Sequence, residues 1–215
     1  MKEVEINKTI KLSPHFTLGE LCKTSYHTLD GNIPSHVAIE NLKNICENWL
    51  EDLRFSYNEL YGEGDRSQES GDRREGGLGF AACYRRDARR REGERREGVR
   101  RQESGKATGR RAQLGNDSRN DKEIPIIISS GYRSEEVNRK CGGAKGSNHL
   151  TGCAVDIHCY GPEQMIRMAG ILMDIADGTK RDFDELIQEK RGSTYWVHFA
   201  VRPSGNRRRI LFDCR

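Results

Sequence analysis

The pattern of apolar and polar residues predicts a long amphipathic helix near the start of the chain. In HVAIENLKNICENWLEDLRFSY, residues 36–57, apolar positions recur every three or four residues: Ala38, Leu42, Ile45, Trp49 and Leu53. This spacing lines one face of a helix, and Ser35 precedes it as a candidate N-cap. The segment before it, LSPHFTLGEL, offers Phe16, Leu18 and Leu21 as buried anchors.

A second apolar stripe predicts another helix in GPEQMIRMAGILMDIADG, residues 161–178. Its apolar face is formed by Met165, Met168, Leu172 and Ile175. Pro162 near the first turn and Gly178 beyond the end are typical boundary residues. A shorter helix is expected over EEVNRKCGG, residues 135–143.

Shorter apolar runs predict strands. Ile124, Ile126, Ile127 and Ile128 form a run suited to a buried strand, followed by a turn over residues 129–134. FDELIQE, TYWVHFAV and RRRILFD are strand-length pieces separated by KRGS and RPSGN, a pattern typical of a β-meander. The chain is therefore expected to form an α+β fold, with a small antiparallel sheet and flanking helices.

The pattern breaks down between residues 62 and 122. This segment is rich in Arg, Gly, Glu and Ser and nearly free of large apolar residues, so burial cannot offset the entropy of ordering it. A connection of this length is unusual, since most take about four to six residues. We expect one domain formed by residues 11–61 and 123–215, interrupted by a low-complexity insertion at residues 62–122 that is disordered or weakly helical.

The positive charge of the chain is concentrated in the same segment. Residues 62–122 hold 15 Arg and 2 Lys against 12 Asp and Glu. Interleaved glutamates and the scarcity of aromatic residues favour a solvated, self-compensating charge run over a nucleic-acid-binding surface. Nucleic acid is therefore not an expected partner.

The cysteines and the hydropathy pattern bear on the compartment. Seven cysteines, an odd number without a CxxC pair, indicate mostly reduced thiols. The start MKEVEINKTIKLSPHF lacks the apolar region of a signal peptide, and no window reaches the length of a membrane span. We expect synthesis in the cytoplasm without a signal peptide, no membrane insertion, and a monomer.

Candidate chemistry lies in GSNHLTGCAVDIHCY, residues 146–160. His149 and Asp156 are seven residues apart, and Gly152 allows the chain to turn between them. Imidazole and carboxylate are ligands that zinc takes in catalytic sites. Spacing alone leaves open a plainer interpretation, in which His149 caps a turn and Asp156 binds backbone amides.

A zinc site would need a third ligand. His198, in the apolar strand TYWVHFAV, is the best candidate, because a neutral imidazole without a partner is costly to bury. His158 is the rival, two residues after Asp156. Cys153 lies between the first two candidates, and thiolates also bind zinc.

The stretch SGYRSEEVNRKCGGAKGSNHLTGCAVDI, residues 130–157, resembles the M15 peptidase family of zinc D-Ala-D-Ala carboxypeptidases and related peptidoglycan endopeptidases. The family pattern Ser-x-His-x-x-Gly-x-Ala-x-Asp matches residues 147–156. The Trp-x-His strand of the family matches Trp196 and His198 in WVHF, which follows DELIQE. The resemblance implies a fold like that of the hedgehog and D-Ala-D-Ala peptidase domains.

The resemblance covers about residues 11–61 and 123–212, whereas residues 62–122 have no counterpart in it. LSPHFTLGEL and ENLKNICENWLEDLR are similar to a subgroup frequent in phages and prophages. In the family pattern Cys153 falls on a variable small position, which favours a packing role for this thiol.

The resemblance implies a role for each matched residue. His149, Asp156 and His198 would hold Zn²⁺, with a water at the fourth position. Arg133 would steady the substrate carbonyl or the oxyanion; the alternative is a structural salt bridge. Ser147 would lie near polar groups of the substrate, although its hydroxyl could equally tie down the turn.

The general base is less clearly marked. Many relatives carry an acid three residues before the last histidine, where this chain has Tyr195. The subgroup alternative is a Glu at the end of the preceding strand, which points to Glu189, with Asp184 and Glu185 as rivals. A slip of one residue in the hairpin register would turn Glu189 to the opposite face.

The implied function is that of a zinc metallopeptidase acting on peptidoglycan stem peptides. It would be a D-Ala-D-Ala carboxypeptidase or an endolysin-type endopeptidase, and a phage lysin would reach the cell wall after release through a separate pore. The Tyr at position 195 motivates an alternative, a non-catalytic zinc-containing binding module on the same fold.

Overall fold

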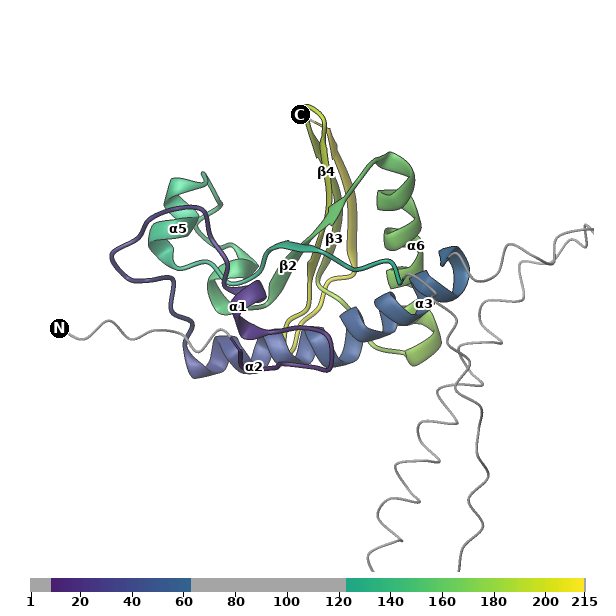
Figure 1. The fold of residues 1–215 in the computed structure, drawn as a ribbon, viewed down its shortest axis with the longest axis horizontal. Helices are drawn as coiled ribbons and strands as arrows, with labels where there is room; N and C mark the ends of the chain where they lie inside the picture. The colour runs from purple at the N-terminus through teal and green to yellow at the C-terminus, as the bar shows by residue number, and fades with distance from the viewer. Residues whose placement is uncertain (1–8, 63–122, 215) are drawn as a thin grey trace, which may run out of the picture. The chain divides into compact units, whose positions relative to one another are not determined.

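Residues 9–62 and 123–214 are described by a computed structural model of the chain (Figure 1). The two stretches build a single unit, to which residues on both sides of the predicted insertion contribute. Apart from Gly62, the predicted insertion at residues 62–122 lies outside the described residues. Its state and the predicted domain boundaries therefore stay predictions.

The long helix predicted from the first apolar stripe is confirmed. The Ser35 hydroxyl caps its start by accepting a hydrogen bond from the Ala38 N–H at 3.2 Å. The helix runs as α2 (His36–Ile45), the π-helical turn η1 (Cys46–Leu50) and α3 (Glu51–Tyr61). Before it, the short helix α1 (Leu18–Leu21) starts at a capping box formed by Thr17 and Glu20.

Five strands form one mixed sheet in the order β1-β2-β4-β3-β5. They are β1 (Ile128–Ser130), β2 (Ala154–Cys159), β3 (Glu185–Arg191), β4 (Thr194–Ala200) and β5 (Arg209–Cys214). All neighbours are antiparallel except β5, which lies parallel to β3. The meander predicted for the last three strands is therefore wrong in its final step. Because β2 and β3 already occupy both edges of β4, the chain returns to the outer edge of β3.

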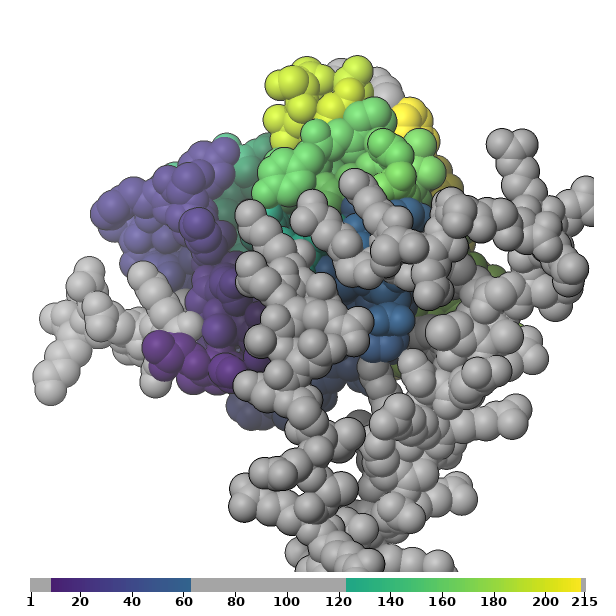
Figure 2. Space-filling view, turned by 45° about the vertical axis from the view of Figure 1, so that its right-hand side comes forward, coloured from purple at the N-terminus to yellow at the C-terminus, as the bar shows by residue number. Residues whose placement is uncertain are grey.

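The other helices lie on both sides of the sheet, so the predicted α+β architecture with flanking helices is confirmed. They are α5 (Glu135–Lys140), the 3₁₀ turn η3 (Asn148–Thr151) and α6 (Pro162–Thr179). α6 packs on the sheet, whereas α5 lies on the opposite side (Figure 1). α6 also packs beside α3 (Figure 2). α6 extends past Gly178, its predicted stop, and ends where Lys180 adopts a left-handed φ of 59°.

The two faces of the sheet differ in polarity. The face towards α3 and α6 carries the apolar core, and its buried residues include Val155, Ile157, Leu186, Val197 and Phe199. Trp49 of η1 closes this core, with its ring centroid 5.0 Å from that of Phe199. Because side chains alternate along a strand, the polar residues between these positions point to the other face, towards α5 and η3.

The apolar run at residues 124–128 differs from its prediction. Only Ile128 enters β1, and of the four isoleucines only Ile126 is buried, while Ile127 is 36% exposed. β1 is an edge strand that pairs with β2 alone. The residues before it therefore lack the second neighbour that a buried strand requires.

Candidate metal centre

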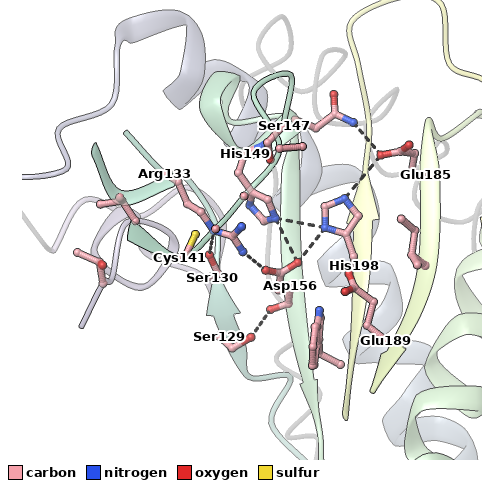
Figure 3. A pocket seen from close by; sticks show the side chains of 18 of the residues that line it. Ser129, Ser130, Arg133, Cys141, Ser147, His149, Asp156, Glu185, Glu189 and His198 are labelled. Carbon is pink, nitrogen blue, oxygen red and sulfur yellow. Dashed lines mark hydrogen bonds and ion pairs between the residues drawn. The ribbon is translucent and has the colours of Figure 1, made fainter. Parts of the chain in front are cut away.

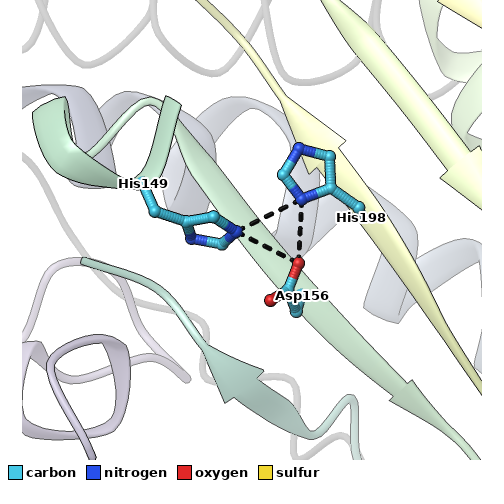
Figure 4. Close-up of side chains that lie close together, drawn as sticks. All are labelled: His149, Asp156 and His198. Carbon is cyan, nitrogen blue, oxygen red and sulfur yellow. Dashed lines mark hydrogen bonds and ion pairs between the residues drawn. The ribbon is translucent and has the colours of Figure 1, made fainter. Parts of the chain in front are cut away.

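Three side chains from three elements converge on the polar face of the sheet (Figure 4). Asp156 of β2 and His198 of β4 are direct cross-strand partners. His149 belongs to η3, and Gly152 turns the chain after it with a left-handed φ of 70°. The turn inferred from the glycine is therefore present, and the three predicted ligands lie together.

The distances between the three side chains suit a zinc ion. Nε2 of His149 lies 3.2 Å from both Oδ1 of Asp156 and Nδ1 of His198, and the last two atoms are 2.9 Å apart. A tetrahedral zinc with bonds of about 2.0–2.1 Å places its ligand atoms about 3.3 Å from one another. The trio can thus hold zinc after shifts of a few tenths of an ångström.

Neighbouring groups orient both imidazoles. Nδ1 of His149 lies 2.5 Å from the carbonyl oxygen of Gly131. A carbonyl only accepts hydrogen bonds, so Nδ1 carries the proton and Nε2 presents its lone pair to the centre. For His198 the arrangement is reversed: Nε2 lies 3.8 Å from Oε2 of Glu185, and Nδ1 faces the centre.

The N-terminal segment holds this arrangement in place. The Tyr132 N–H donates to the carbonyl oxygen of Leu21 at 2.7 Å. A Cβ at Gly131 would lie 2.3 Å from the same oxygen, so the close approach of this loop to α1 requires glycine. The carbonyl that orients His149 is therefore positioned by α1.

Burial and mutual bonding set the protonation of the trio. His149, Asp156 and His198 are 2%, 6% and 9% exposed. Burial lowers the pKa of His149. Burial alone would raise the pKa of Asp156, but the two histidines hold it far below its usual range, and Asp156 in turn raises the pKa of His198 against the effect of burial. Asp156 is thus a carboxylate and His149 is neutral, the forms that bind metals.

Arg133 contacts the proposed ligand set directly. Its guanidinium forms an ion pair with Oδ2 of Asp156, and its Nε donates to the hydroxyl of Ser130 at 2.8 Å. The salt bridge considered for Arg133 is therefore present, and its partner is a proposed metal ligand. Arg133 also lines the cleft in front of the trio (Figure 3).

Ser147 has a structural contact and a place in the cleft. Its hydroxyl accepts a hydrogen bond from the His149 N–H at 3.4 Å and caps η3. It also lines the same cleft. The hydroxyl does tie down the turn, and a contact with substrate stays a prediction.

The three candidate bases have different surroundings. Asp184 is fully buried, accepts hydrogen bonds from Arg207 and Asn148, and forms an ion pair with Arg202. Glu185 forms ion pairs with Arg207 and Arg209.

Within the described part of the chain, Glu189 forms no ion pair with an arginine. It is the cross-strand partner of Trp196, and it lies two residues after Ile187, the partner of His198. Because residues two apart in a strand share a face, its side chain lies on the face that carries His198. It is half-buried, and burial, followed by the charge of Asp156, raises its pKa.

The rival ligands lie outside the trio. The ring of His158 packs edge-on against Tyr160, with centroids 5.2 Å apart. Cys153 is buried and its Sγ lies 3.9 Å from the carbonyl oxygen of Thr151. Tyr195 is the neighbour of Trp196 in β4 and therefore points to the opposite face of the sheet.

A cleft of about 730 Å³ lies in front of the trio (Figure 3). Its walls include the loop at residues 23–26, the connection from α5 to η3, and the polar face of β3 and β4. The sequence did not point to Asn148, which joins η3 to Asp184 and Glu185, or to Lys23 and Arg191. Nothing in the sequence indicated Arg191 either, because it falls in KRGS, which was expected to separate two strands, whereas β3 extends to Arg191 in the structure.

A family model described as Peptidase M15 matches residues 86–182. The match includes Arg133, Ser147, His149 and Asp156 and ends before β3, and its first part, residues 86–122, lies outside the described residues. No curated protein and no solved structure matches the chain. Among the described residues, no helix is long and apolar enough to cross a membrane.

Proposed function

The chain belongs to the M15 peptidase family, and on this premise we propose that it is a zinc metallopeptidase that cleaves peptidoglycan stem peptides, as a D-Ala-D-Ala carboxypeptidase or an endolysin-type endopeptidase. The observation that carries the proposal is the triangle of Nε2 of His149, Oδ1 of Asp156 and Nδ1 of His198, with sides of 2.9–3.2 Å. When bound, zinc would polarise the scissile carbonyl and activate a water for attack.

In this proposal Glu189 is the general base. It takes a proton from the attacking water and returns it to the leaving amine. Two observations support Glu189 over its rivals: arginines engage both Asp184 and Glu185, and burial raises the pKa of Glu189. A raised pKa suits a group that must accept and release a proton near neutral pH.

Arg133 is proposed to stabilise the oxyanion. One part of its guanidinium holds Oδ2 of Asp156, and the side chain also lines the cleft. A positive charge fixed next to the metal ligands is favourable where negative charge develops on the substrate oxygen. Its bond to Ser130 restrains it in that position.

The resemblance of LSPHFTLGEL and ENLKNICENWLEDLR to a phage and prophage subgroup supports a proposal about where the protein acts. We propose a monomeric lysin-type enzyme that acts on the cell wall after release, with the peptidoglycan stem peptide as its substrate.

The non-catalytic zinc module is the second candidate. Tyr195 stands where many relatives carry an acid, and its side chain points away from the trio. The two functions differ in one measurement. A catalytic protein releases amines from defined muropeptides, whereas a binding module holds zinc and releases none.

The test combines zinc content with hydrolysis. We expect about one zinc per chain by mass spectrometry of the metal, and cleavage of defined muropeptides that a chelator abolishes and zinc restores. His149→Ala and His198→Ala should each lose both properties. His158→Ala is the matched control, because this histidine lies two residues from Asp156 on the same strand and outside the trio. Hydrolysis by fully metal-free protein would refute the proposal.

A further inference from the structure

Five basic side chains line the cleft: Lys23, Arg133, Arg191, Arg202 and Arg207. Three of them are held by carboxylates of the fold itself: Arg133, Arg202 and Arg207. Within residues 9–62 and 123–214, no carboxylate lies within ion-pair distance of Lys23 or Arg191. These two cations are therefore available to a ligand in the cleft.

Arg191 is the better placed of the two. It lies at the end of β3, two residues after Glu189 and four after Ile187, the cross-strand partner of His198. Side chains at even spacing share one face of a strand. Arg191 therefore lies on the same face of the sheet as Glu189, where it lines the cleft.

An aromatic ring supports the Arg191 side chain. The guanidinium carbon lies 5.9 Å from the ring centroid of Trp196, a cation–π distance. Trp196 is the cross-strand partner of Glu189 and lines the cleft as well. Stacking reduces the freedom of the guanidinium and leaves its N–H groups for a planar acceptor such as a carboxylate. Lys23 lies in a loop and has no such support among the described residues.

The position of Arg191 sets a distance from the proposed metal. Arg191 lies four residues along β3 from Ile187, the cross-strand partner of His198. At about 3.3 Å per residue, this is a distance of about 13 Å along the strand. An extended peptide covers this length with about four residues, and the long arginine side chain can shorten the gap. A carboxylate about three residues from the scissile bond would therefore meet the guanidinium.

We infer that Arg191 is a specificity-determining residue that binds a carboxylate of the peptide substrate about three residues from the bond that is cleaved. This inference rests on the proposed peptidase function. It implies that the enzyme prefers a peptide with a free acid at that position over the same peptide with an amide. The side chain of Arg191 is exposed, so the effect is moderate and weakens with salt.

The same hairpin offers a matched control. Lys190 is the neighbour of Arg191 and stacks on Tyr195, with 5.7 Å between its Nζ and the ring centroid. Its side chain points to the opposite face of the sheet, because alternate residues of a strand face opposite ways. Lys190→Gln therefore removes one positive charge and one cation–π contact from the same hairpin, but none from the cleft.

The experiment measures binding and cleavage separately. Synthetic stem peptides carry each carboxylate in turn as the free acid or as the primary amide. Binding to the zinc-loaded full chain is followed by tryptophan fluorescence. The chain has two tryptophans, and Trp49 is 1% exposed, so changes report on Trp196. KM and kcat are measured for the same peptides.

We expect the native chain to prefer one acid over its amide by about 2- to 5-fold in Kd and KM. Arg191→Gln should abolish this preference in Kd and KM, whereas Lys190→Gln and Lys23→Gln should keep it. The inference is overturned if the native chain shows no preference at any position, if Arg191→Gln retains it, or if Lys23→Gln removes it instead. Binding with the expected preference but without cleavage would refute the proposed peptidase function while supporting the role of Arg191.

Discussion

The backbones of Gly152 and Ala38 approach so closely that a Cβ on the glycine would lie 2.3 Å from the Ala38 carbonyl oxygen. Gly152 also adopts a left-handed φ of 70°. Gly152 therefore meets two requirements at once: it reverses the chain between the proposed ligands His149 and Asp156, and it allows that turn to pack against α2. Because the obstacle is backbone, it cannot move aside as a flexible side chain would.

We accordingly expect Gly152→Ala to lower the free energy of unfolding by about 3 kcal/mol or more and to weaken zinc binding. Gly142→Ala is the control, because Gly142 has a φ of 73° but nothing lies within 4 Å of a Cβ built there. It should cost only the left-handed strain of about 1–2 kcal/mol. Urea unfolding with and without zinc measures both. Equal losses for the two variants would show that the contact with Ala38 is unimportant.

The two glutamates of β3 on the site face should have separable effects. Glu189→Gln removes the proposed base and should reduce kcat at least 100-fold while zinc stays bound. Glu185→Gln removes the carboxylate 3.8 Å from Nε2 of His198 and should weaken zinc binding by about 10-fold or more. With zinc in excess, its kcat should be largely restored. The reverse outcome, with normal kcat in Glu189→Gln, would assign the base elsewhere.

The convergence of the three proposed ligands was predictable, although their role as ligands stays a prediction. A seven-residue spacing with a glycine at the turn brings His149 to Asp156, and the apolar strand around His198 indicated a buried imidazole. The resemblance to a known family then selected His198 over His158. Asp156 and His198 are cross-strand partners. Their side chains therefore share one face of the sheet, as two ligands of one metal ion must.

The parts that could not be predicted depend on residues far apart in the chain. Asp184 and Glu185 are engaged by arginines from the loop and strand after β4, and nothing in DELIQE indicates which carboxylate is left without an arginine. The register that places Glu189 on the site face is also set by pairing, not by composition. The parallel position of β5 arises because both edges of β4 are occupied, which the lengths of the connections do not reveal.

Asp184 should stabilise the fold in a pH-dependent way. Burial alone would raise the pKa of this carboxyl, but hydrogen bonds from Arg207 and Asn148 hold it below its usual range. An unfolded Asp titrates near pH 3.9. The stabilisation from Asp184 is therefore complete above about pH 4 and is lost as the pH falls from there towards the lower pKa of the folded state.

For Asp184→Asn we expect a loss of about 1–3 kcal/mol at pH 7. The further fall in stability below about pH 4 should be shallower than in the native chain. Thermal and urea unfolding in the presence of a chelator measure this without a contribution from zinc. Asp182→Asn is the control, since the side chain of Asp182 is 60% exposed, and it should change little. Parallel pH profiles for Asp184→Asn and the native chain would contradict the assignment.

Asn58 joins the two ends between which the predicted insertion runs. Its side-chain oxygen accepts a hydrogen bond from the Ile124 N–H at 2.7 Å, and its amide donates to the Ile124 carbonyl oxygen at 3.0 Å. Residues 66 positions apart in the chain are thus held side by side. A connection of about four to six residues can close such a gap.

We therefore expect that replacing residues 64–121 by a short Gly/Ser linker leaves zinc content and thermal stability nearly unchanged. Loop-closure entropy changes by only about 0.6 kcal/mol for each doubling of length, so shortening the connection from about 60 to about six residues should raise the free energy of unfolding by at most about 2 kcal/mol. A Gly/Ser segment of the original length is the control that separates length from composition. The family-model match begins at residue 86, inside the predicted insertion. The experiment therefore decides whether residues 86–121 belong to the insertion or to the domain. If both replacements lose zinc or unfold at much lower temperature, residues 86–121 belong to the peptidase domain and the predicted boundaries are wrong.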